Sequence, residues 1–548
     1  MNQSQINQNN NSQPEGYPVL KEHVIYFFTA CILYAILFAI AFYRNYLGIT
    51  FPIITMATIV LCLLFLKKAQ IPVKKRSLTY AAAAMLLGIS NFLTANSIIV
   101  FFNTIGILIL LTVFMLGQLY DDRQWTPGRY ICNILFFYLC MIPELAAPCI
   151  HAGNYIRKIR MKNQEETNKT VKYIICGILL GIPMVCFAVW MLSSADAIFS
   201  DYVGKVFQSF LSKIADTPNI FLILFLLILG FFGMYTFLSA LTLNNMPRET
   251  TDREKRNPIV AITFLLMVTA VYLVFCGIQV IFLFTGGAVL PEGYTYAEYA
   301  RQGFFQLLFV CVFNFVLVTV CVSMFQKNKY LWMILLIFSG CTYVMIASSA
   351  LRMLLYISVY HLTFLRVLVL WFLAMLAVLM AGVVAQIFKP DFAMFPYSMA
   401  VVTGFYLVFS FAKPDYWIAR YNVAHMENEI SVQDMWYLTC LSPDAAPVLK
   451  DISQKHCHEP EQKESEQYKS EQYKSEQNEL EQGYYDEDSA ELLYGEGSVG
   501  EYIPNCAACQ LESYFHNIQN SCGKMGVRGF HLSKYQALKA AEEYFLEE

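Results

Sequence analysis

Apolar segments of about 20 residues, separated by short polar or basic stretches, recur along the chain up to residue 412. An α-helix needs about 20 apolar residues to cross the roughly 30 Å hydrocarbon core of a bilayer. A spanning helix satisfies its own backbone hydrogen bonds, so this pattern predicts an all-α, polytopic membrane helix bundle with about eleven spanning helices. The predicted spans are 24–43, 49–66, 77–95, 97–119, 171–192, 219–243, 259–285, 304–325, 330–348, 362–388 and 394–412.

The apolar segment 131–150 is interrupted by two prolines and by Glu144. Basic residues cluster before it, at 67–76, and after it, at 157–172. The positive-inside rule places such clusters in the cytoplasm. Both ends of 131–150 then lie on the cytoplasmic side, and we interpret this segment as re-entrant or interfacial. The eleven-span topology predicts a multi-pass protein of the bacterial cytoplasmic membrane, with a cytoplasmic N-terminus and an extracytoplasmic C-terminus.

Composition divides the chain into two physically different parts. Only 14% of all residues are charged and 57% are hydrophobic, whereas about 25% are charged in ordinary soluble domains. Residues 413–548 carry 11 Lys+Arg against 25 Asp+Glu, a charge of −14, while the whole chain has a net charge of −3. We therefore predict a membrane body and a partly disordered acidic C-terminal tail. The expected domains are a disordered polar N-terminus (1–23), a transmembrane domain (24–412), a short extracytoplasmic helical segment (413–458), a low-complexity acidic spacer (459–497) and a small C-terminal segment (498–548).

Three sequence motifs resemble those of an uncharacterised family of bacterial multipass membrane proteins, a domain of unknown function. They are GYTYAEYARQGFFQL (293–307), SALRMLLYISVYHLTFLR (349–366) and PDYWIARYN (414–422), the last followed by LSPDAAPVL (441–449). The resemblance implies a polytopic fold and an extracytoplasmic end to the last span, and it implies no activity. In the predicted topology all three motifs lie on the extracytoplasmic side.

Charged residues near the predicted outer turns are candidates for a polar site. We predict a short aqueous turn near 349–361 on the extracytoplasmic side. Arg352 and Arg366 flank this turn between two spans, where a guanidinium is costly unless it snorkels to the interface or pairs. Arg301 follows Glu298 by three residues, on the same face of a helix. We predict an outward-facing site that holds an anionic group of a lipid, wall precursor or peptide. The alternative is that the arginines pair with acidic residues (Glu298, Asp196 or Glu292) and lock helix ends together. The candidate ligand-binding residues are Glu298, Arg301, Arg352, Tyr356, Tyr360 and Arg366.

Polar amides within the spans either line a substrate path or hydrogen-bond between helices, and we favour the packing interpretation. These residues are Asn91, Asn103, Gln118, Gln279, Gln306, Asn314 and Gln386. No Asp, Glu or Lys lies in the middle of a predicted span, which argues against an ion-coupled transporter. In the tail, Cys506 and Cys509 form a CxxC pair without a second pair at zinc-site spacing. We assign no catalytic residue, metal or cofactor.

Several function classes remain open at this point. The small cytoplasmic loops favour a non-enzymatic envelope protein, a sensor or assembly factor whose outer face binds a ligand and whose signal passes to a separate regulatory protein. A transporter or channel is the main alternative, and it predicts a continuous polar path and inverted repeats. A membrane-embedded transferase acting on a lipid-linked substrate is the second alternative, with a general base such as Glu298 or His361. We expect the lipid bilayer as a partner and no nucleic acid.

Overall fold

The computed structural model describes most of the chain as α-helices. Apart from an isolated bridge between Arg256 and Phe325, the described part of the chain contains no β structure. The described residues are 19–45, 48–120, 125, 127–160, 220–243, 256–281, 296–389, 392–426, 430–452, 507–523 and 525–546, together with scattered residues between 181 and 205. The predicted N-terminal lead up to residue 18 and the spacer 459–497 lie outside them.

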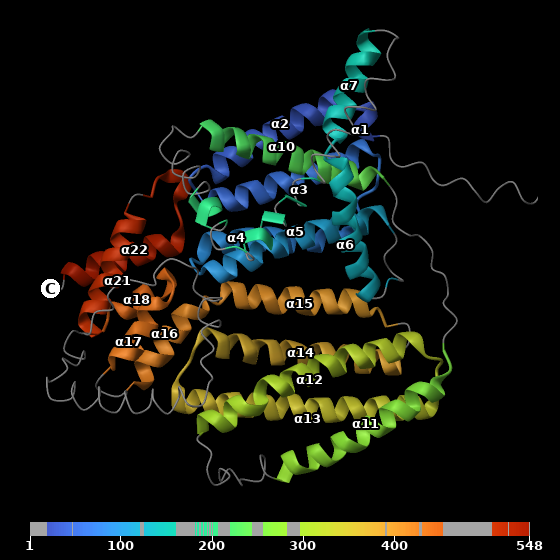
Figure 1. Cartoon of the computed structure of the whole chain (residues 1–548), viewed down its shortest axis with the longest axis vertical. Coiled ribbons are helices and arrows are strands. Elements are labelled where there is room, and N and C mark those ends of the chain that lie inside the picture. The colour runs from blue at the N-terminus through green and yellow to red at the C-terminus, as the bar shows by residue number, and fades with distance from the viewer. Residues whose placement is uncertain are drawn as a thin grey trace, which may run out of the picture.

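Nine helices in the described part of the chain are long and apolar enough to cross a membrane. They are α2 (Val24–Phe42), α3 (Thr50–Lys68), α5 (Ser97–Leu119), α10 (Ile220–Thr242), α11 (Pro258–Gln279), α12 (Tyr296–Met324), α13 (Lys329–Tyr360), α14 (Phe364–Phe388) and α15 (Met394–Phe411). Helix α4 (Lys75–Leu93) lies alongside them (Figure 1). The predicted polytopic helix bundle is thus confirmed. Every predicted span coincides with a helix except 171–192, which lies largely outside the described residues.

The helix bundle has two opposite ends (Figure 1). One end, here called the basic end, carries the residues 67–76, Arg256, 326–329 and Lys389. The short helix α1 (Val19–Glu22) also lies at the basic end. The opposite end carries the turns 43–49, 94–96 and 361–363 and is called the module end. Sequential helices run in opposite directions, because the turns that connect them lie alternately at the module end and at the basic end.

Helix α4 is less apolar than its neighbours α3 and α5, and small residues bring it close to them. It packs between α3 and α5, and its buried face includes Ala81, Ala84 and Gly88. A Cβ atom added at Gly88 would lie 2.9 Å from Oγ1 of Thr55 on α3. Small residues of this kind let helix backbones approach closely in membranes, where dispersion and hydrogen bonds drive association. Helix α4 is therefore held by close packing more than by contact with lipid.

Helix α15 joins two halves of the bundle. It contacts α4 and α6 on one side and α14 on the other, and Figure 1 shows it between the two groups. Near the module end, the Ser410 hydroxyl lies 2.6 Å from that of Ser90 and donates to Oδ1 of Asn103 at 2.9 Å. Asn103 in turn donates to Oδ1 of Asn91 at 2.7 Å. These buried hydrogen bonds support the packing interpretation of the amides in the spans.

The ambiguous segment 131–150 lies across the basic end. It forms α6 (Pro127–Glu144) and α7 (Ala147–Arg160), which are bent by 47°. At the start of α6, Tyr130 stacks on Phe395, the second residue of α15. At its end, Glu144 accepts a hydrogen bond from Ser239, near the end of α10. Both ends of α6 therefore contact the basic end, in agreement with a re-entrant or interfacial segment.

One expectation about the outer turns is wrong. The residues 349–361, expected as a short aqueous turn, continue helix α13 as far as Tyr360. Neither Gly nor Pro interrupts this segment, and Met353 and Ile357 remain buried against neighbouring helices. At 1.5 Å per residue the 32 residues of α13 measure about 48 Å, which exceeds the hydrocarbon thickness. The last turns of α13 therefore project beyond the bilayer core at the module end.

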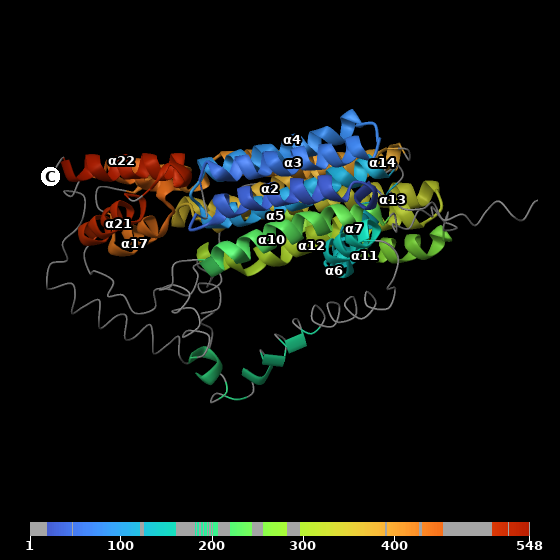
Figure 2. The same cartoon turned by 90° about the horizontal axis from the view of Figure 1, so that it is seen from above.

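The helices after α15 form a compact unit, here called the C-terminal module, at the module end (Figures 1 and 2). It comprises α16 (Pro414–His425), α17 (Val432–Cys440), η2 (Pro443–Ala445), α18 (Ala446–Leu449), α21 (Ala507–Cys522), η4 (Val527–Gly529) and α22 (Leu532–Leu546). The helices on either side of the spacer share one core, which includes Ile418, Leu438, Leu449, Leu511 and Phe515.

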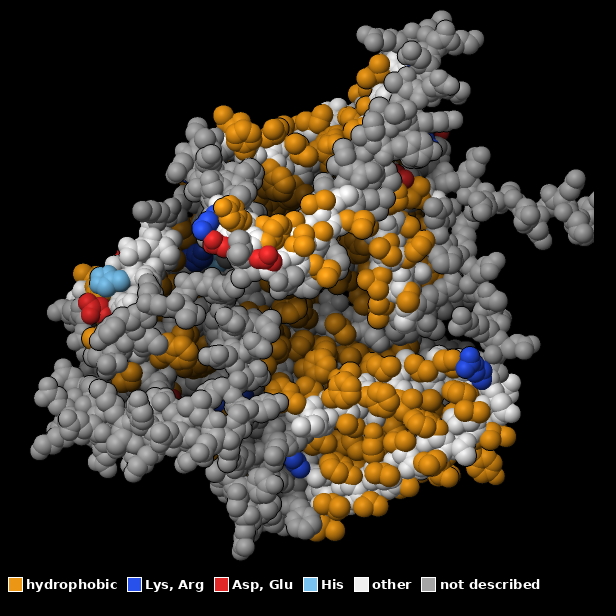
Figure 3. Space-filling view, in the orientation of Figure 1, with side chains coloured by type: hydrophobic (Ala, Val, Ile, Leu, Met, Phe, Trp, Pro, Cys, Tyr) orange, Lys and Arg blue, Asp and Glu red, His pale blue; other side chains and the backbone are white. Residues whose placement is uncertain are grey.

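Large apolar side chains cover the flank of the bundle (Figure 3). Phe101, Met267 and Phe309, for example, are 61%, 73% and 72% exposed. An exposed apolar surface of this extent is costly in water and favourable against lipid tails. The chain is thus a multipass membrane protein with the bilayer as its immediate partner.

Candidate functional site

Arg352, one of the predicted ligand-binding residues, points into the bundle. It lies on α13 and is only 9% exposed. Its Nη2 donates to Oε1 of Gln279, at the end of α11, at 3.2 Å. The same amide oxygen accepts a hydrogen bond from Ser348 at 2.6 Å. Arg352 thus connects α13 to α11 near the module end.

Arg366 holds the turn between α13 and α14. Its Nη1 donates to the carbonyl oxygens of Tyr360 and His361, which end α13. Its guanidinium carbon lies 4.1 Å from the centre of the Tyr356 ring, and the Tyr356 and Tyr360 rings are 5.1 Å apart. A cation at the carboxyl end of a helix is favoured by the helix dipole and by the free carbonyls. These contacts match the helix-locking alternative, with backbone carbonyls in place of the expected carboxylates.

The remaining two predicted site residues begin another helix. Glu298 and Arg301 lie in the first turns of α12, and their side chains are outside the described part of the structure. The structure thus brings Tyr356, Tyr360 and Arg366 together, and it turns Arg352 towards α11. The proposed anion site at these residues stays a prediction.

Two buried carboxylates, which the sequence reasoning missed, attach the C-terminal module to the bundle. Asp444 is 4% exposed, and its Oδ2 accepts hydrogen bonds from Oγ1 of Thr94 at 2.6 Å and from the amide of Ala95 at 3.1 Å. Its Oδ1 accepts a hydrogen bond from Ser533 on α22. Buried charge is tolerated only when hydrogen-bonded in this way. Asp444 therefore joins three chain segments: η2, α22 and the turn between α4 and α5.

Asp415 makes the second attachment to the same turn. It is 2% exposed, and its Oδ2 accepts hydrogen bonds from Nδ2 of Asn96 at 2.8 Å and from the amide of Ser442 at 3.2 Å. Burial raises the pKa of this carboxyl, while the hydrogen bonds from Ser442 and Asn96 lower it. Asn96 also caps the start of α5 by accepting from the amide of Ile99 at 3.0 Å. The α4–α5 turn is therefore held by two carboxylates at once.

A buried histidine completes the attachment. His531 is fully buried, and its Nε2 donates to the carbonyls of Asn91 at 3.2 Å and Thr94 at 3.1 Å. Its Nδ1 accepts a hydrogen bond from the amide of Lys534 at 3.3 Å. These partners require the neutral ring, because a proton on Nδ1 would face the Lys534 amide. Burial accordingly lowers the pKa of His531 to about 4, helped by the charge of Lys534 and opposed by that of Asp444.

A pocket of about 470 Å³ opens beside Asp444, where α15 meets the module. Lys413, Lys450 and Lys539 line it, from three segments far apart in the sequence. Lys450 pairs with Glu543, and Nζ of Lys539 lies 3.6 Å from the other oxygen of that carboxylate. These lysines lower the pKa of Glu543. Within the pocket, Lys450 and Lys539 therefore stabilise the carboxylate of Glu543, which also lines the pocket.

Aromatic residues form the membrane-proximal side of this pocket, here called the lysine pocket. Tyr416 and Trp417 lie in the first turn of α16, just after the end of α15, and Trp417 is 54% exposed. Aromatic residues of this kind are enriched where protein meets the membrane–water interface. The lysine pocket thus combines cations with an interfacial position.

The backbone at the entrance of the lysine pocket is strained. Lys413 adopts a left-handed conformation with φ 51° and ψ 68°. This region costs a residue other than glycine about 1–3 kcal/mol, and a following proline, here Pro414, restricts the residue further. The conformation directs Nζ of Lys413 to within 3.8 Å of Asp444 and 3.3 Å of Oε1 of Gln536.

A second, smaller pocket of about 250 Å³ lies on the other side of the attachment. Asp415, Asn96, Thr363 and Tyr437 are among the residues that line it. The Tyr437 hydroxyl accepts a hydrogen bond from the amide of Phe364 at 3.0 Å, which ties α17 to the start of α14. The two buried carboxylates thus each border a cavity.

Part of this site was within reach of sequence reasoning. Asp415 and Asp444 belong to the segments PDYWIARYN and LSPDAAPVL, and both follow a proline that begins a helix. Their partners Ser533 and His531 lie beyond the acidic spacer, and no local pattern connects them. Of the predicted CxxC pair, Cys506 lies outside the described residues and Cys509 is exposed on α21.

The fold and the site together define a class of protein: a polytopic α-helical membrane protein with a helical module closed onto one end of its bundle. The family described as "Domain of unknown function (DUF4153)" matches residues 81–452. The chain belongs to this family, and the predicted resemblance is confirmed. The match includes α16 to α18, and the module helices α21 and α22 lie beyond it. No curated protein and no solved structure matches the chain.

Proposed function

We propose that this protein acts in the bacterial envelope as a sensor or assembly factor that binds an anionic group in the lysine pocket. The observation that carries this proposal is the convergence of Lys413, Lys450 and Lys539 beside interfacial aromatic residues. Glu543 marks where an anionic oxygen is held between two of these lysines. A phosphate on an amphiphile fits the position best, because the apolar part can enter the interface next to Trp417.

The orientation of the chain is part of the proposal. The basic end carries the clusters that the positive-inside rule assigns to the cytoplasm. The C-terminal module lies at the opposite end of the bundle, so we place it and the lysine pocket outside the cytoplasmic membrane. The ligand is then the anionic group of a lipid, wall precursor or peptide of the envelope.

Binding at the lysine pocket has a direct route to the membrane helices. Asp444 lines the pocket and also accepts hydrogen bonds from Thr94 and Ala95 in the α4–α5 turn. A ligand that draws Lys413 away from Asp444 changes the charge balance at that turn. The bound state is thus communicated to α4 and α5, and from them to a separate regulatory protein.

Transport is less well supported than sensing. None of the nine described spans contains Asp or Glu within its apolar window, although ion coupling usually uses such a residue. In the described part of the bundle, polar side chains such as Tyr272 and Asn314, which are 3.0 Å apart, link neighbouring helices. This arrangement supports the packing interpretation of the buried amides.

The proposal is tested by titrating the purified full-length chain with dihexanoyl phosphatidic acid and following the fluorescence of Trp417. The signal of this residue is the difference between the wild type and Trp417→Phe. We expect saturable binding that Lys450→Gln combined with Lys539→Gln weakens by at least tenfold. Lys534→Gln combined with Arg528→Gln removes two positive charges from the same module outside the pocket, and this control variant should bind normally. Equal binding of dihexanoyl phosphatidylcholine, or no effect of the double substitution, would refute the proposal.

A further inference from the structure

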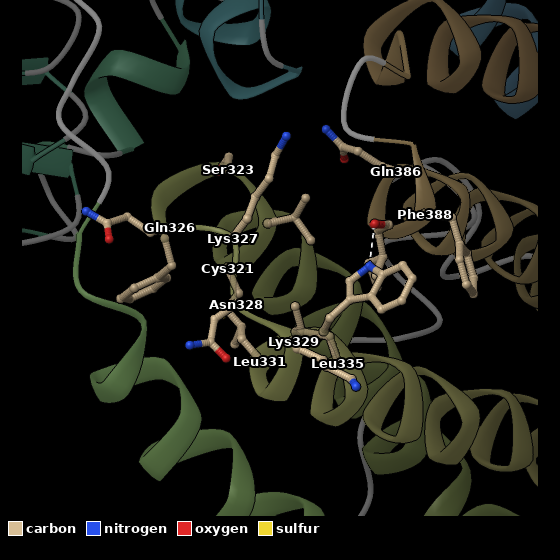
Figure 4. A pocket seen from close by; sticks show the side chains of 14 residues that line it. Cys321, Ser323, Gln326, Lys327, Asn328, Lys329, Leu331, Leu335, Gln386 and Phe388 are labelled. Carbon is tan, nitrogen blue, oxygen red and sulfur yellow. Dashed lines mark hydrogen bonds between the residues drawn. The ribbon is translucent and has the colours of Figure 1, made fainter.

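A large cavity in the described part of the protein lies at the basic end, far from the lysine pocket. It has a volume of about 610 Å³ and is bounded by the ends of α12 and α14 and the start of α13. Figure 4 shows the side chains that line it. This position is the junction between the apolar flank of the bundle and its basic rim.

Apolar and aromatic side chains form the walls of this cavity, next to the ends of α12 and α14 and the start of α13. Leu331, Leu335 and Phe388 contribute to them. Trp332 also lines the cavity, and its indole donates to the carbonyl of Ile387. An indole anchored in this way is typical of the interface between hydrocarbon and headgroups. Acyl chains are the ligand chemistry that such walls accept from a bilayer.

The rim of the cavity is cationic. Lys327 and Lys329 both line it and both are exposed. Asn328 between them caps α13, accepting from the amide of Tyr330 at 2.8 Å. The start of α13 therefore adds its free amides and its positive dipole end to the two lysines. Among the residues that the structure describes, no Asp or Glu lines the cavity.

A polar acceptor inside the cavity lacks a donor. Oε1 of Gln386 is buried and has no hydrogen-bond partner among the described residues, and Gln386 lines the cavity opposite Lys327 (Figure 4). An orphaned buried acceptor is costly, by about 1–3 kcal/mol. The hydroxyl groups of a glycerol headgroup are donors of suitable chemistry.

We propose that this cavity is a binding site for an anionic phospholipid of the leaflet at the basic end, with phosphatidylglycerol as the best fit. The lysines hold the phosphate, the apolar walls hold an acyl chain, and Gln386 accepts from the glycerol headgroup. Basic pockets between membrane helices bind anionic headgroups by the same combination. This site is independent of the lysine pocket, which lies at the opposite end.

The test uses the full-length chain in vesicles and the fluorescence of Trp332, taken as the difference between the wild type and Trp332→Phe. Brominated phosphatidylglycerol and brominated phosphatidylcholine are compared as quenchers at equal mole fraction. Two lysines near the surface predict a preference of about 30-fold for phosphatidylglycerol. Lys327→Gln with Lys329→Gln should remove that preference. Lys67→Gln with Lys75→Gln removes two charges at the same end outside the cavity and should retain it.

A second variant tests the cavity without changing charge. Ser323→Phe fills part of the volume, and we expect it to reduce quenching of Trp332 by phosphatidylglycerol at least threefold. Native mass spectrometry gives an independent count of bound phosphatidylglycerol for each variant. Equal quenching by both lipids, or equal loss of preference in the two double-lysine variants, would show general surface attraction only and would overturn the proposal.

Discussion

Replacing Asp444 by alanine should loosen the C-terminal module from the bundle. The carboxylate accepts hydrogen bonds from Thr94, Ala95 and Ser533 and lies 3.8 Å from the ammonium of Lys413. Its removal leaves a buried backbone amide and two hydroxyl groups without their acceptor. Breaking a buried, hydrogen-bonded charge pair costs about 3–5 kcal/mol. The fraction of molecules with an undocked module should rise by roughly two to nearly four orders of magnitude.

Hydrogen–deuterium exchange of the full-length protein in nanodiscs measures this undocking directly. Exchange should accelerate in α22 and at the amides of the α4–α5 turn, while the middle of α13 should be unaffected. Asp444→Asn keeps the volume but places an amide donor against donors, so it should behave similarly. Asp451→Asn changes an exposed carboxylate of the same module and should alter the free energy by less than about 0.5 kcal/mol. Exchange in α22 within threefold of the wild type for Asp444→Ala would refute the assigned role.

Three further changes test the remaining parts of the fold. Docking of the module should weaken as the pH falls from about 6.5 to 4, by up to about 3 kcal/mol, because His531 has its pKa lowered to about 4 and an undocked histidine gains a proton earlier. Asp415 has the opposite effect: burial raises its pKa, so its contribution to docking grows as the pH falls. The difference in exchange between the wild type and His531→Gln therefore isolates the contribution of the histidine. An unchanged dependence of docking on pH in that variant would contradict its role. Arg366→Lys should cost about 1–2 kcal/mol in thermal unfolding, because lysine keeps the charge but loses the flat guanidinium that stacks on tyrosine; Arg366→Met should cost at least as much, and no loss in either would argue against the helix-locking role. Gly230→Val should destabilise the α2–α10 contact by about 1–3 kcal/mol, since a Cβ there would lie 3.0–3.1 Å from α2, whereas Gly233→Ala, with open space around it, should be tolerated.

The ends of a helix were predictable where the whole helix lies within the bilayer. Spans such as 97–119 coincide with their helix because a bilayer requires a continuous apolar segment of nearly fixed length. The prediction was wrong at 349–361, where a helix that leaves the bilayer meets protein instead of water. An apolar face that contacts protein and one that contacts lipid look alike in sequence, so the end of α13 could not be read from composition.

The sequence alone determined that this protein is a multipass helical membrane protein, because hydrocarbon tolerates only chain segments that are apolar and internally hydrogen-bonded. It also marked PDYWIARYN and LSPDAAPVL as shared with a family. Tertiary structure alone decided which charged residues matter. The lysine pocket and the Asp444 attachment join segments separated by an acidic spacer and by hundreds of residues. Contacts of that range depend on how the whole bundle packs, and no periodicity in the sequence encodes them.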